Sequence, residues 1–438
     1  MSDVFSNTSH ILEEYLDNLD RSNEYEFHYS KVSGAEVTTR FGQVENIQYH
    51  DDSSLTITCI FDKKKGIAST NNLNESSIKS TINKSKTIAS FLEEDIYQGL
   101  PRENLIKKTD IDCGINFPKE YTTQEMIDIT TECEKSALDY DKRISNSEGS
   151  QFLFSRSKHL ILNSNGARGS YSSTSYTLSC VVLAEDKGLK ERDYAYSTKR
   201  NYQRIDNPSE IGRLSAEKAV GRLGAKSISS KICPIILSPE LSVGLIASFL
   251  SAIDGNNIYK KNSFLLDKLG KNIFSDHITI KENPNLIEGL GNKPFDNEGV
   301  ITSEKKIIDS GMLETFLLDT YSARQLKSVS TGNCGYTNIL IESSIDQPDD
   351  IISNVDDGVL VTEMMGSGAN ILTGDYSRGA FGYLIKNGKI SHPVTNFTVA
   401  SNMLDMFKNI SAIGNDTYNN SKIKCGSLLI DKMTIGGN

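Results

Sequence analysis

Residues 232–253 read ICPIILSPELSVGLIASFLSAI, the stretch that decides how the second half of the chain folds. A membrane span needs about 20 continuous apolar residues, whereas Pro234, Pro239 and Glu240 interrupt this stretch. The pattern instead predicts a short buried strand followed by a core helix over residues 241–253. We expect this helix to cover a curved, largely antiparallel sheet, because the chain beyond it has short apolar runs between frequent Gly and Asn turns.

A stripe of small side chains runs along the predicted helix. Gly244, Ser248, Ala252 and Gly255 recur at spacings of four, four and three, so they share one helical face. We expect a neighbour to pack very close to this face. Two interpretations stay open, namely a tight helix-on-sheet contact within the domain, or the approach of a subunit or substrate.

The first half of the chain carries both helical and strand-like patterns. Apolar residues spaced by three and four predict helices, and runs rich in Val, Thr and Ile predict strands. The predicted helices cover residues 11–19, 76–97, 123–144 and 208–223. The predicted strands cover residues 35–49 and 54–61 and a region from 151 to 195, with a hairpin around Asn165 and Gly166.

Together these patterns predict an α+β fold with its main boundary near Ala225. Residues 1–225 should form an N-terminal α/β region with long helices, which could itself divide into subdomains of about 1–115 and 116–225. Residues 226–438 should form a C-terminal, mainly β domain with a large, curved, mainly antiparallel sheet.

The charge balance limits the classes of partner. The 438 residues include 47 basic and 57 acidic side chains, whereas a nucleic-acid binder needs a clustered excess of Lys and Arg. We therefore expect no nucleic-acid partner and no membrane partner. The first residues lack the pattern of a signal peptide, and the seven cysteines are odd in number with no CxxC pair, which favours a reducing cytoplasm.

The sequence contains none of the short motifs that would identify a common catalytic site. No helical HExxH pair, GxSxG elbow or Gly-rich phosphate loop occurs. Two polar stretches remain, PFDNEG at 294–299 and TGDYSRGAFG at 373–382, which concentrate carboxylates, amides and glycines. Such loops often carry function, although Asp, Asn and Gly are also the residues that tight turns require. Each stretch could therefore line a cleft or simply form a turn.

Longer motifs carry a family resemblance. They include LNSNG at 162–166, LSPE at 237–240, PFDNEGV at 294–300, LLDTYSARQL at 317–326 and GDYSRGAFGYLIKNGKISHPV at 374–394. With these motifs the sequence resembles the family of TldD and PmbA (also called TldE), which are cytoplasmic peptidase-related proteins. The resemblance covers nearly the whole chain, and several long matches in the same order make it specific.

The resemblance also implies a difference at the predicted helix. The TldD branch carries HExxxH there, with two His that bind zinc and a Glu that activates water. The matching positions are Ala247, Ser248 and Ala252, whose side chains cannot act as zinc ligands or as a general base. Cys425 lacks the context of the cysteine that resembles a third ligand in TldD, so we expect an ordinary core thiol. The chain thus resembles the PmbA/TldE branch.

Membership of that branch implies a heterodimer. We expect a PmbA/TldE-like subunit of a cytoplasmic metalloprotease that degrades or trims small, unfolded or modified peptides. This chain would have no catalytic residue, metal or cofactor of its own, and zinc would be held by a TldD-like partner that bears HExxxH. The candidates for the substrate cleft are Asp296, Asn297, Glu298, Asn333 and Asp375.

Two other functions stay open. The chain could be an independent hydrolase whose catalytic groups follow no motif named above. It could also be a non-enzymatic peptide-binding or regulatory protein that keeps the fold.

Overall fold

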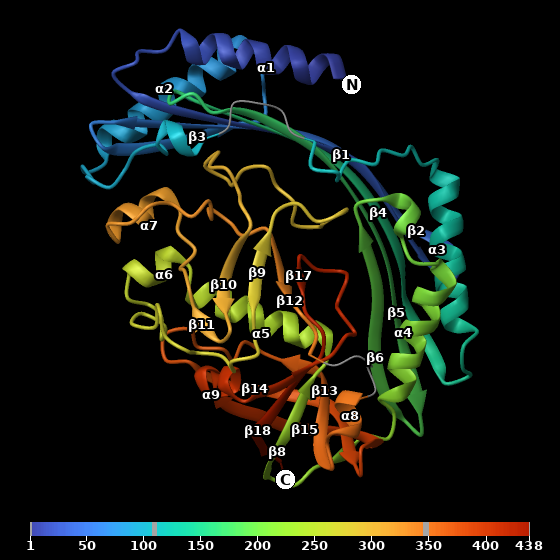
Figure 1. Ribbon diagram of the computed structural model, residues 1–438. Helices are drawn as coiled ribbons and strands as arrows, with labels where there is room; N and C mark the ends of the chain where they lie inside the picture. The colour runs from blue at the N-terminus through green and yellow to red at the C-terminus, as the bar shows by residue number, and fades with distance from the viewer. Residues whose placement is uncertain (1, 107–111, 345–349, 438) are drawn as a thin grey trace.

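One long sheet curls around two shorter ones in the computed structural model, which describes residues 2–106, 112–344 and 350–437 (Figure 1). Helices cover the outer face of the long sheet, and another helix crosses between the two shorter sheets (Figure 1). This architecture confirms the predicted α+β fold class.

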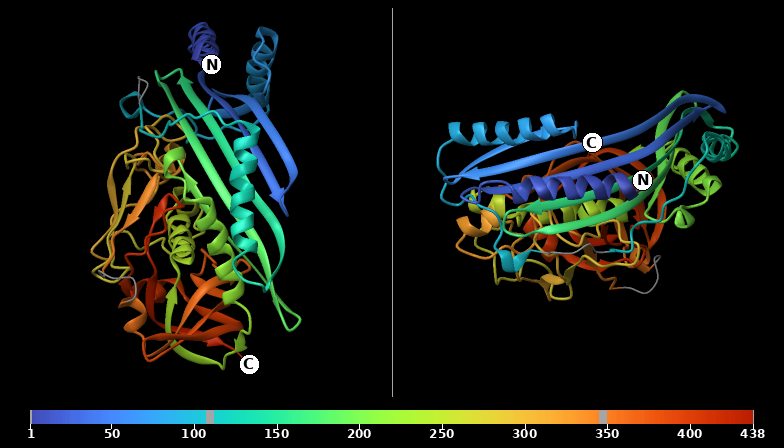
Figure 2. Two further views of the ribbon diagram at one scale, coloured as in Figure 1. Left: turned by 90° about the vertical axis from the view of Figure 1, so that its right-hand side faces the viewer. Right: turned by 90° about the horizontal axis from the view of Figure 1, so that it is seen from above.

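The long sheet has six antiparallel strands in the order β3-β2-β1-β4-β5-β6. In chain order they are β1 (Glu24–Arg40), β2 (Gln43–Phe61), β3 (Lys64–Thr70), β4 (Ile144–Asn163), β5 (Arg168–Asp186) and β6 (Leu189–Lys199). Its outer face carries α1 (Ser2–Asp17), α2 (Glu75–Phe91), α3 (Thr123–Leu138) and α4 (Pro208–Gly221). Figure 2 shows the same curl from two further sides.

Side-chain alternation in β1 gives the long sheet its two faces. Tyr25, Phe27 and Tyr29 are buried in the core formed with α1 and α2. Because successive strand residues point to opposite faces, Glu26 and His28 face the concave side. The concave side is therefore polar at the place where it meets the C-terminal half.

The C-terminal half contains a seven-stranded and a five-stranded sheet. The first has the order β16 (Ile410–Ile413), β18 (Leu428–Gly436), β8 (Lys231–Leu237), β13 (Asp357–Met365), β14 (Asp375–Lys386), β15 (Lys389–Asn402), β7 (Lys226–Ser227). Most of its pairs are antiparallel, and it curves until β15 also pairs with β18. The second has the order β11 (Met312–Leu313), β10 (Lys305–Asp309), β9 (Ile280–Asn283), β12 (Asn338–Ile341), β17 (Ile423–Lys424).

Helix α5 (Pro239–Ala252) lies at the centre of this half (Figure 1). Leu245 and Phe249 are fully buried and share one core with residues of both C-terminal sheets. The predicted strand and core helix are therefore confirmed. The helix starts two residues earlier than predicted, because Pro239 occupies its first turn, where a missing N–H costs nothing.

Short helices complete the chain. They are α6 (Gly255–Tyr259), α7 (Thr320–Gln325), α8 (Asp350–Ser353) and α9 (Met403–Lys408), with 3-10 turns at Glu103–Leu105 and Tyr202–Arg204. Among the described residues, no helix has the length and apolar character needed to cross a membrane.

Several predicted boundaries are wrong. The predicted strand 35–49 contains the tight turn between β1 and β2, where Phe41 and Gly42 both have positive φ angles, 50° and 67°. The predicted helices 76–97 and 123–144 end early, at Phe91 and Leu138. Acidic residues follow each end, and negative charge is unfavourable at a helix C-terminus. The hairpin around Asn165 and Gly166 is confirmed.

Candidate functional site

Asp296 organises the loop 294–300, which lies against the concave face of the long sheet. Its Oδ1 accepts hydrogen bonds from the backbone N–H groups of Glu298 (2.9 Å) and Val300 (3.0 Å). Its Oδ2 accepts one from the N–H of Cys334 (2.9 Å), on a separate loop. Asp296 is only 2% exposed, so these donors offset the cost of burying its charge. The carboxylate therefore fixes the geometry of two loops at once.

Three ligand-type side chains converge beside this loop, and we call Glu298, Asp319 and Cys334 the seam cluster. One ligand atom from each lies within 4.8 Å of the others. Asp319 is positioned as the N-cap of α7, where it accepts from the N–H of Ser322 (2.7 Å). Within the described part of the chain, the seam cluster is the one group of three His, Cys, Asp or Glu side chains arranged closely enough to share a metal ion.

Burial and like charges shift the titration of these groups. Burial, followed by the charge of Asp296, raises the pKa of Glu298 to about 7. Burial also raises the pKa of the Cys334 thiol, and the carboxylates of Glu298 and Asp296 add to that effect. The pKa of Asp296 is raised by burial against the opposing effect of its backbone donors. Perturbed groups that gather in one place are typical of functional sites.

A small pocket of about 220 Å³ opens beside the loop on the concave face. His28 and His159 line it from the sheet, and Phe295 and Asn297 line it from the loop. Burial, then the charge of Lys293, lowers the pKa of His159 to about 4, so its imidazole is neutral at pH 7. The pocket thus offers a neutral imidazole and an exposed amide to a ligand.

The positions that match HExxxH lie on α5 without any metal-binding groups. Ser248 Oγ donates to the Gly244 carbonyl of its own helix (3.0 Å). Ala252 is fully buried, and its carbonyl accepts from Ser263 Oγ (2.6 Å). Ala247 is partly buried against the core. Cys425 is fully buried, as expected of a core thiol.

The stripe of small residues divides into two environments. Gly255 begins α6, beyond the end of α5, so the prediction that it shares the helical face of the other three is wrong. A Cβ added at Gly255 would lie 2.2 Å from Ser322 Oγ, so α7 packs very close to it. A Cβ added at Gly244 would have no neighbour within 4 Å. The close contact predicted for the whole stripe therefore occurs at Gly255 and not at Gly244, which is open to an approaching molecule.

The five predicted cleft residues do not all come together. Asp296, Asn297 and Glu298 lie at the seam, as described. Asn333 is buried, and its Nδ2 donates to Glu282 (2.9 Å) while its Oδ1 accepts from Lys305 (2.8 Å), so it serves an internal network. Asp375 begins β14 in the seven-stranded sheet, where its exposed carboxylate accepts a hydrogen bond from the Thr373 hydroxyl (2.7 Å).

A groove that the sequence did not reveal separates β6 and α4 from the start of α5, and we call it the inter-sheet groove. Its volume is about 650 Å³. Tyr194 Oη donates to Glu240 (2.7 Å) across it. Arg222 pairs with Glu191 (3.0 Å) and lies 4.1 Å from the centre of the Phe381 ring. The sequence predicts strands up to residue 195, but nothing in it shows that α5 lies opposite β6.

A loop from the C-terminal half anchors the free edge of β6 beside this groove. Asn420 Oδ1 accepts from the N–H of Thr198 (3.1 Å), and its Nδ2 donates to the carbonyl of Tyr196 (2.8 Å). The amide thus occupies the place of one strand residue. These two hydrogen bonds fix the edge of β6 beside the inter-sheet groove, which Tyr194 of the same strand lines.

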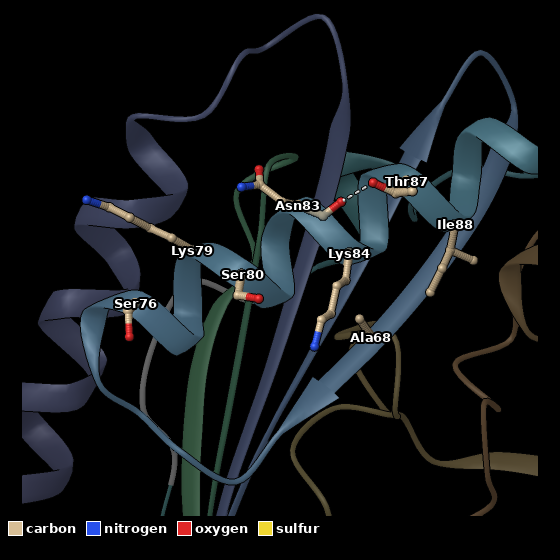
Figure 3. Close-up of a pocket in the computed structure, with 8 residues that line it drawn as sticks. All are labelled: Ala68, Ser76, Lys79, Ser80, Asn83, Lys84, Thr87 and Ile88. Carbon is tan, nitrogen blue, oxygen red and sulfur yellow. Dashed lines mark hydrogen bonds between the residues drawn. The ribbon is translucent and has the colours of Figure 1, made fainter.

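Figure 3 shows a third hollow, on the outside of α2. Its polar side chains come mainly from that one helix, and Lys79 and Lys84 point in different directions. Lys79 pairs with Glu75 on the same helix. This hollow brings no distant segments together, so we do not consider it a candidate site.

Profiles of one metallopeptidase family match most of the sequence. Residues 25–89 match the PmbA/TldA metallopeptidase domain 1, residues 116–223 match the central domain, and residues 229–437 match the C-terminal domain. The seam cluster lies within the part that matches the C-terminal domain. The inter-sheet groove is lined by residues from both the central-domain match and the C-terminal-domain match.

Named relatives extend over nearly the same length. A protein named Metalloprotease PmbA from Escherichia coli O157:H7 is 38% identical over 95% of this chain and 93% of its own. A Metalloprotease PmbA homolog from Haemophilus influenzae is 36% identical over 93% of this chain and 91% of its own. A Metalloprotease TldD homolog from Buchnera aphidicola is 24% identical over 89% of this chain and 87% of its own.

Two crystal structures share the fold. One, from Bacteroides thetaiotaomicron and named as a suspected modulator of a DNA gyrase, has a TM-score of 0.92 and 27% identity over 99% of both chains. The other, TldE from Thermococcus kodakarensis, has a TM-score of 0.83 and 20% identity over 99% of this chain and 100% of that chain.

Proposed function

Because the chain belongs to the PmbA/TldD metallopeptidase family, we propose that it is the PmbA/TldE-type subunit of a two-chain metalloprotease. In this proposal a TldD-like partner with HExxxH holds the catalytic zinc, and the substrates are small, unfolded or modified peptides. This chain contributes binding surface and no hydrolytic metal.

The composition of α5 carries this proposal. A zinc protease needs side chains with lone pairs on the metal and a group that activates water. Ala247, Ser248 and Ala252 provide neither, and Ala252 is completely buried. Hydrolysis in this assembly must then come from the other polypeptide.

The inter-sheet groove is the surface that we propose for peptide binding. It combines an aromatic side chain, Tyr194, with charged groups of both signs, including Arg222 and Glu240. Aromatic and charged groups in a hollow of this size can bind extended peptides of varied sequence. Asp296 and Asn297 keep their proposed role at the smaller pocket, which they line from the loop 294–300, and Glu298 follows them in that loop.

We propose a cytoplasmic location. None of the seven cysteines, all of which lie in the described part of the chain, forms a disulfide, and five of them are buried. Their number and separation favour a reducing environment.

Reconstitution tests the proposal directly. The chain is purified alone and together with an HExxxH-bearing subunit from the same genome, and cleavage of an unfolded peptide is measured. We expect cleavage in the mixture and none with the chain alone. Replacing the Glu of the partner's HExxxH with Gln should abolish cleavage. Hydrolysis by this chain alone would identify an independent hydrolase and refute the proposal.

A matched pair of variants tests the groove. Tyr194 and Tyr140 are 38% and 40% exposed, but only Tyr194 lines the groove. Tyr194→Ala should raise the Kd of an unfolded peptide about tenfold, the effect of losing roughly 1.4 kcal/mol. Tyr140→Ala should leave the Kd unchanged. Peptide binding that persists when no HExxxH partner is recovered would favour the non-enzymatic peptide-binding or regulatory function instead.

A further inference from the structure

The seam cluster assembles ligand-type groups from separate segments. Glu298 comes from the loop 294–300, Asp319 from the start of α7, and Cys334 from the loop that Asp296 holds in place. In a zinc site with bonds of about 2.0–2.3 Å, neighbouring ligand atoms lie roughly 3.5 Å apart. Side-chain movements of about an ångström would therefore bring these three atoms, now within 4.8 Å of one another, onto one ion.

Two buried oxygen atoms beside the cluster have no hydrogen-bond partner among the described residues. Thr320 is 6% exposed, and its Oγ1 is unpartnered although its backbone N–H donates to Glu298 Oε2 (2.8 Å). The Thr320 hydroxyl still lies near enough to Glu298 to lower the pKa of that carboxyl group. An oxygen buried in this way costs free energy unless it finds a donor or a cation.

The second such atom belongs to Glu26, at the start of β1. Glu26 is 8% exposed, and its Oε2 is unpartnered while its Oε1 lies 3.0 Å from His28 Nε2. Its charge is close enough to raise the pKa values of Asp296 and Cys334. A bound cation would stabilise a buried carboxylate oxygen that has no donor and whose charge acts on acidic neighbours.

Two basic side chains, Lys293 and Arg324, lie near these carboxylates. Lys293 bonds to the amide oxygen of Asn297 (3.1 Å). Arg324, on α7, donates to the backbone carbonyls of Gly99 (2.7 Å) and Leu100 (2.6 Å). The charge of Lys293 acts on Asp296 and Cys334, whereas the guanidinium of Arg324 is bonded to backbone carbonyls.

We propose that Glu298, Asp319 and Cys334 bind one divalent cation of the zinc type, with the Thr320 hydroxyl or a water as a further ligand and Glu26 as an outer counter-charge. The thiolate favours a borderline-soft ion such as Zn²⁺ over Mg²⁺ or Ca²⁺. The three ligands come from the loop 294–300, the start of α7 and the loop at Cys334, so the ion fixes three segments of the C-terminal half to one another. The site is separate from the helix positions at which a TldD-type zinc would lie.

Binding is coupled to proton release. The Cys334 thiol loses its proton as its sulfur bonds to Zn²⁺, and protonated Glu298 loses its proton as its oxygen does so. Up to two protons therefore leave for each ion bound, with no change of oxidation state. Zinc affinity should consequently rise with pH, because the ligands must lose their protons to bind the ion.

The experiment measures Zn²⁺ binding to the full chain without a partner. Competition with a chelator and metal analysis should give one ion per chain, and Cd²⁺ should produce a thiolate charge-transfer absorption. Cys334→Ser should weaken Zn²⁺ binding by at least tenfold and abolish that absorption. Cys113 is the matched control, since it is the other cysteine of intermediate exposure, and Cys113→Ser should change neither result.

A second measurement needs no variant and so does not depend on the folding of C334S. Zn²⁺ should slow the alkylation of Cys334, read by peptide mass spectrometry, and leave that of Cys113 unchanged. Absence of saturable binding, or equal protection of both thiols, would overturn the proposal. Zinc bound at Cys334 without hydrolysis agrees with the proposed function, whereas failure to bind zinc leaves that function intact. Cleavage by this chain alone would refute the proposed function, but it would not contradict the proposed zinc site at the seam cluster.

Discussion

Helix α5 and the seam cluster differ in every property that metal binding requires. On α5, the positions that match HExxxH carry methyl groups and one hydroxyl that bonds to its own helix. At the seam, two carboxylates and a thiol converge from three segments beside unpartnered oxygens. A motif on one helix can be read from spacing, but a set assembled by loops cannot. Loss of a ligand motif in one place therefore says nothing about ligands elsewhere in the same chain.

The largest effect should come from removing the carboxylate that holds the seam loops together. Asp296→Ala leaves the backbone N–H groups of Glu298, Val300 and Cys334 without an acceptor. It should lower the free energy of unfolding by about 4 kcal/mol, measured by urea titration. Asp375→Ala, at the exposed start of β14, should cost less than about 0.5 kcal/mol. Equal losses would show that the two carboxylates are equivalent.

The pH dependence of stability should report the buried carboxyl of Glu298. Its pKa in the folded protein, about 7, lies above its ordinary value of 4.5, so the folded state binds the proton more tightly. The free energy of unfolding should therefore fall as pH rises through this window, by at most about 3 kcal/mol. Glu298→Gln should remove that part of the slope. Denaturation of both proteins from pH 4 to 8 is the measurement, and identical slopes would contradict the assigned environment, in which Asp296 and Asp319 also face this carboxyl.

Gly244, on α5, and Gly255, at the start of α6, should respond in opposite directions. Gly255→Ala places a methyl group against Ser322 and should cost about 2 kcal/mol. Gly244→Ala meets no neighbour and should stabilise the chain by about 0.5–1 kcal/mol, because alanine is the better helix former. Thermal unfolding of the chain alone compares them. If Gly244→Ala is stabilising alone but weakens assembly with an HExxxH subunit, a partner approaches the open end of the stripe.

The smallest effect belongs to Ser248. Its hydroxyl bonds only to the carbonyl of Gly244 one turn earlier, so Ser248→Ala should change the free energy of unfolding by less than about 0.5 kcal/mol. Cleavage by the reconstituted two-chain enzyme should also stay the same. A large loss of cleavage would give α5 a chemical role that its composition does not predict.

Local patterns predicted the elements whose structure is set by neighbouring residues. The strand and helix of 232–253 and the hairpin at Asn165 and Gly166 depend on apolar periodicity and turn residues, and both are present. The break at Phe41 was missed because Phe is an unusual residue at positive φ, so the turn had no strong signal. Helix ends were overestimated where acidic residues continued the periodic pattern.

The candidate site shows the limit of the same reasoning. The stretch 294–299 stands out in the sequence because it concentrates carboxylates, amides and glycines. Asp319 and Cys334 do not stand out, because no other member of the seam cluster lies close to either of them in sequence. Asn333 is a cleft candidate from the sequence, and the structure shows its side chain buried against Glu282. The inter-sheet groove was missed because its walls, β6 and α5, are far apart in sequence and meet only through the curl of the long sheet.

Anomalous X-ray scattering at the zinc absorption edge, from crystals of this chain grown with Zn²⁺, tests the contrast between α5 and the seam most directly. We predict a peak between Glu298, Asp319 and Cys334 and no peak beside Ala247, Ser248 and Ala252. A peak on α5 held by side chains of this chain, or a seam without one at saturating zinc, would contradict the account.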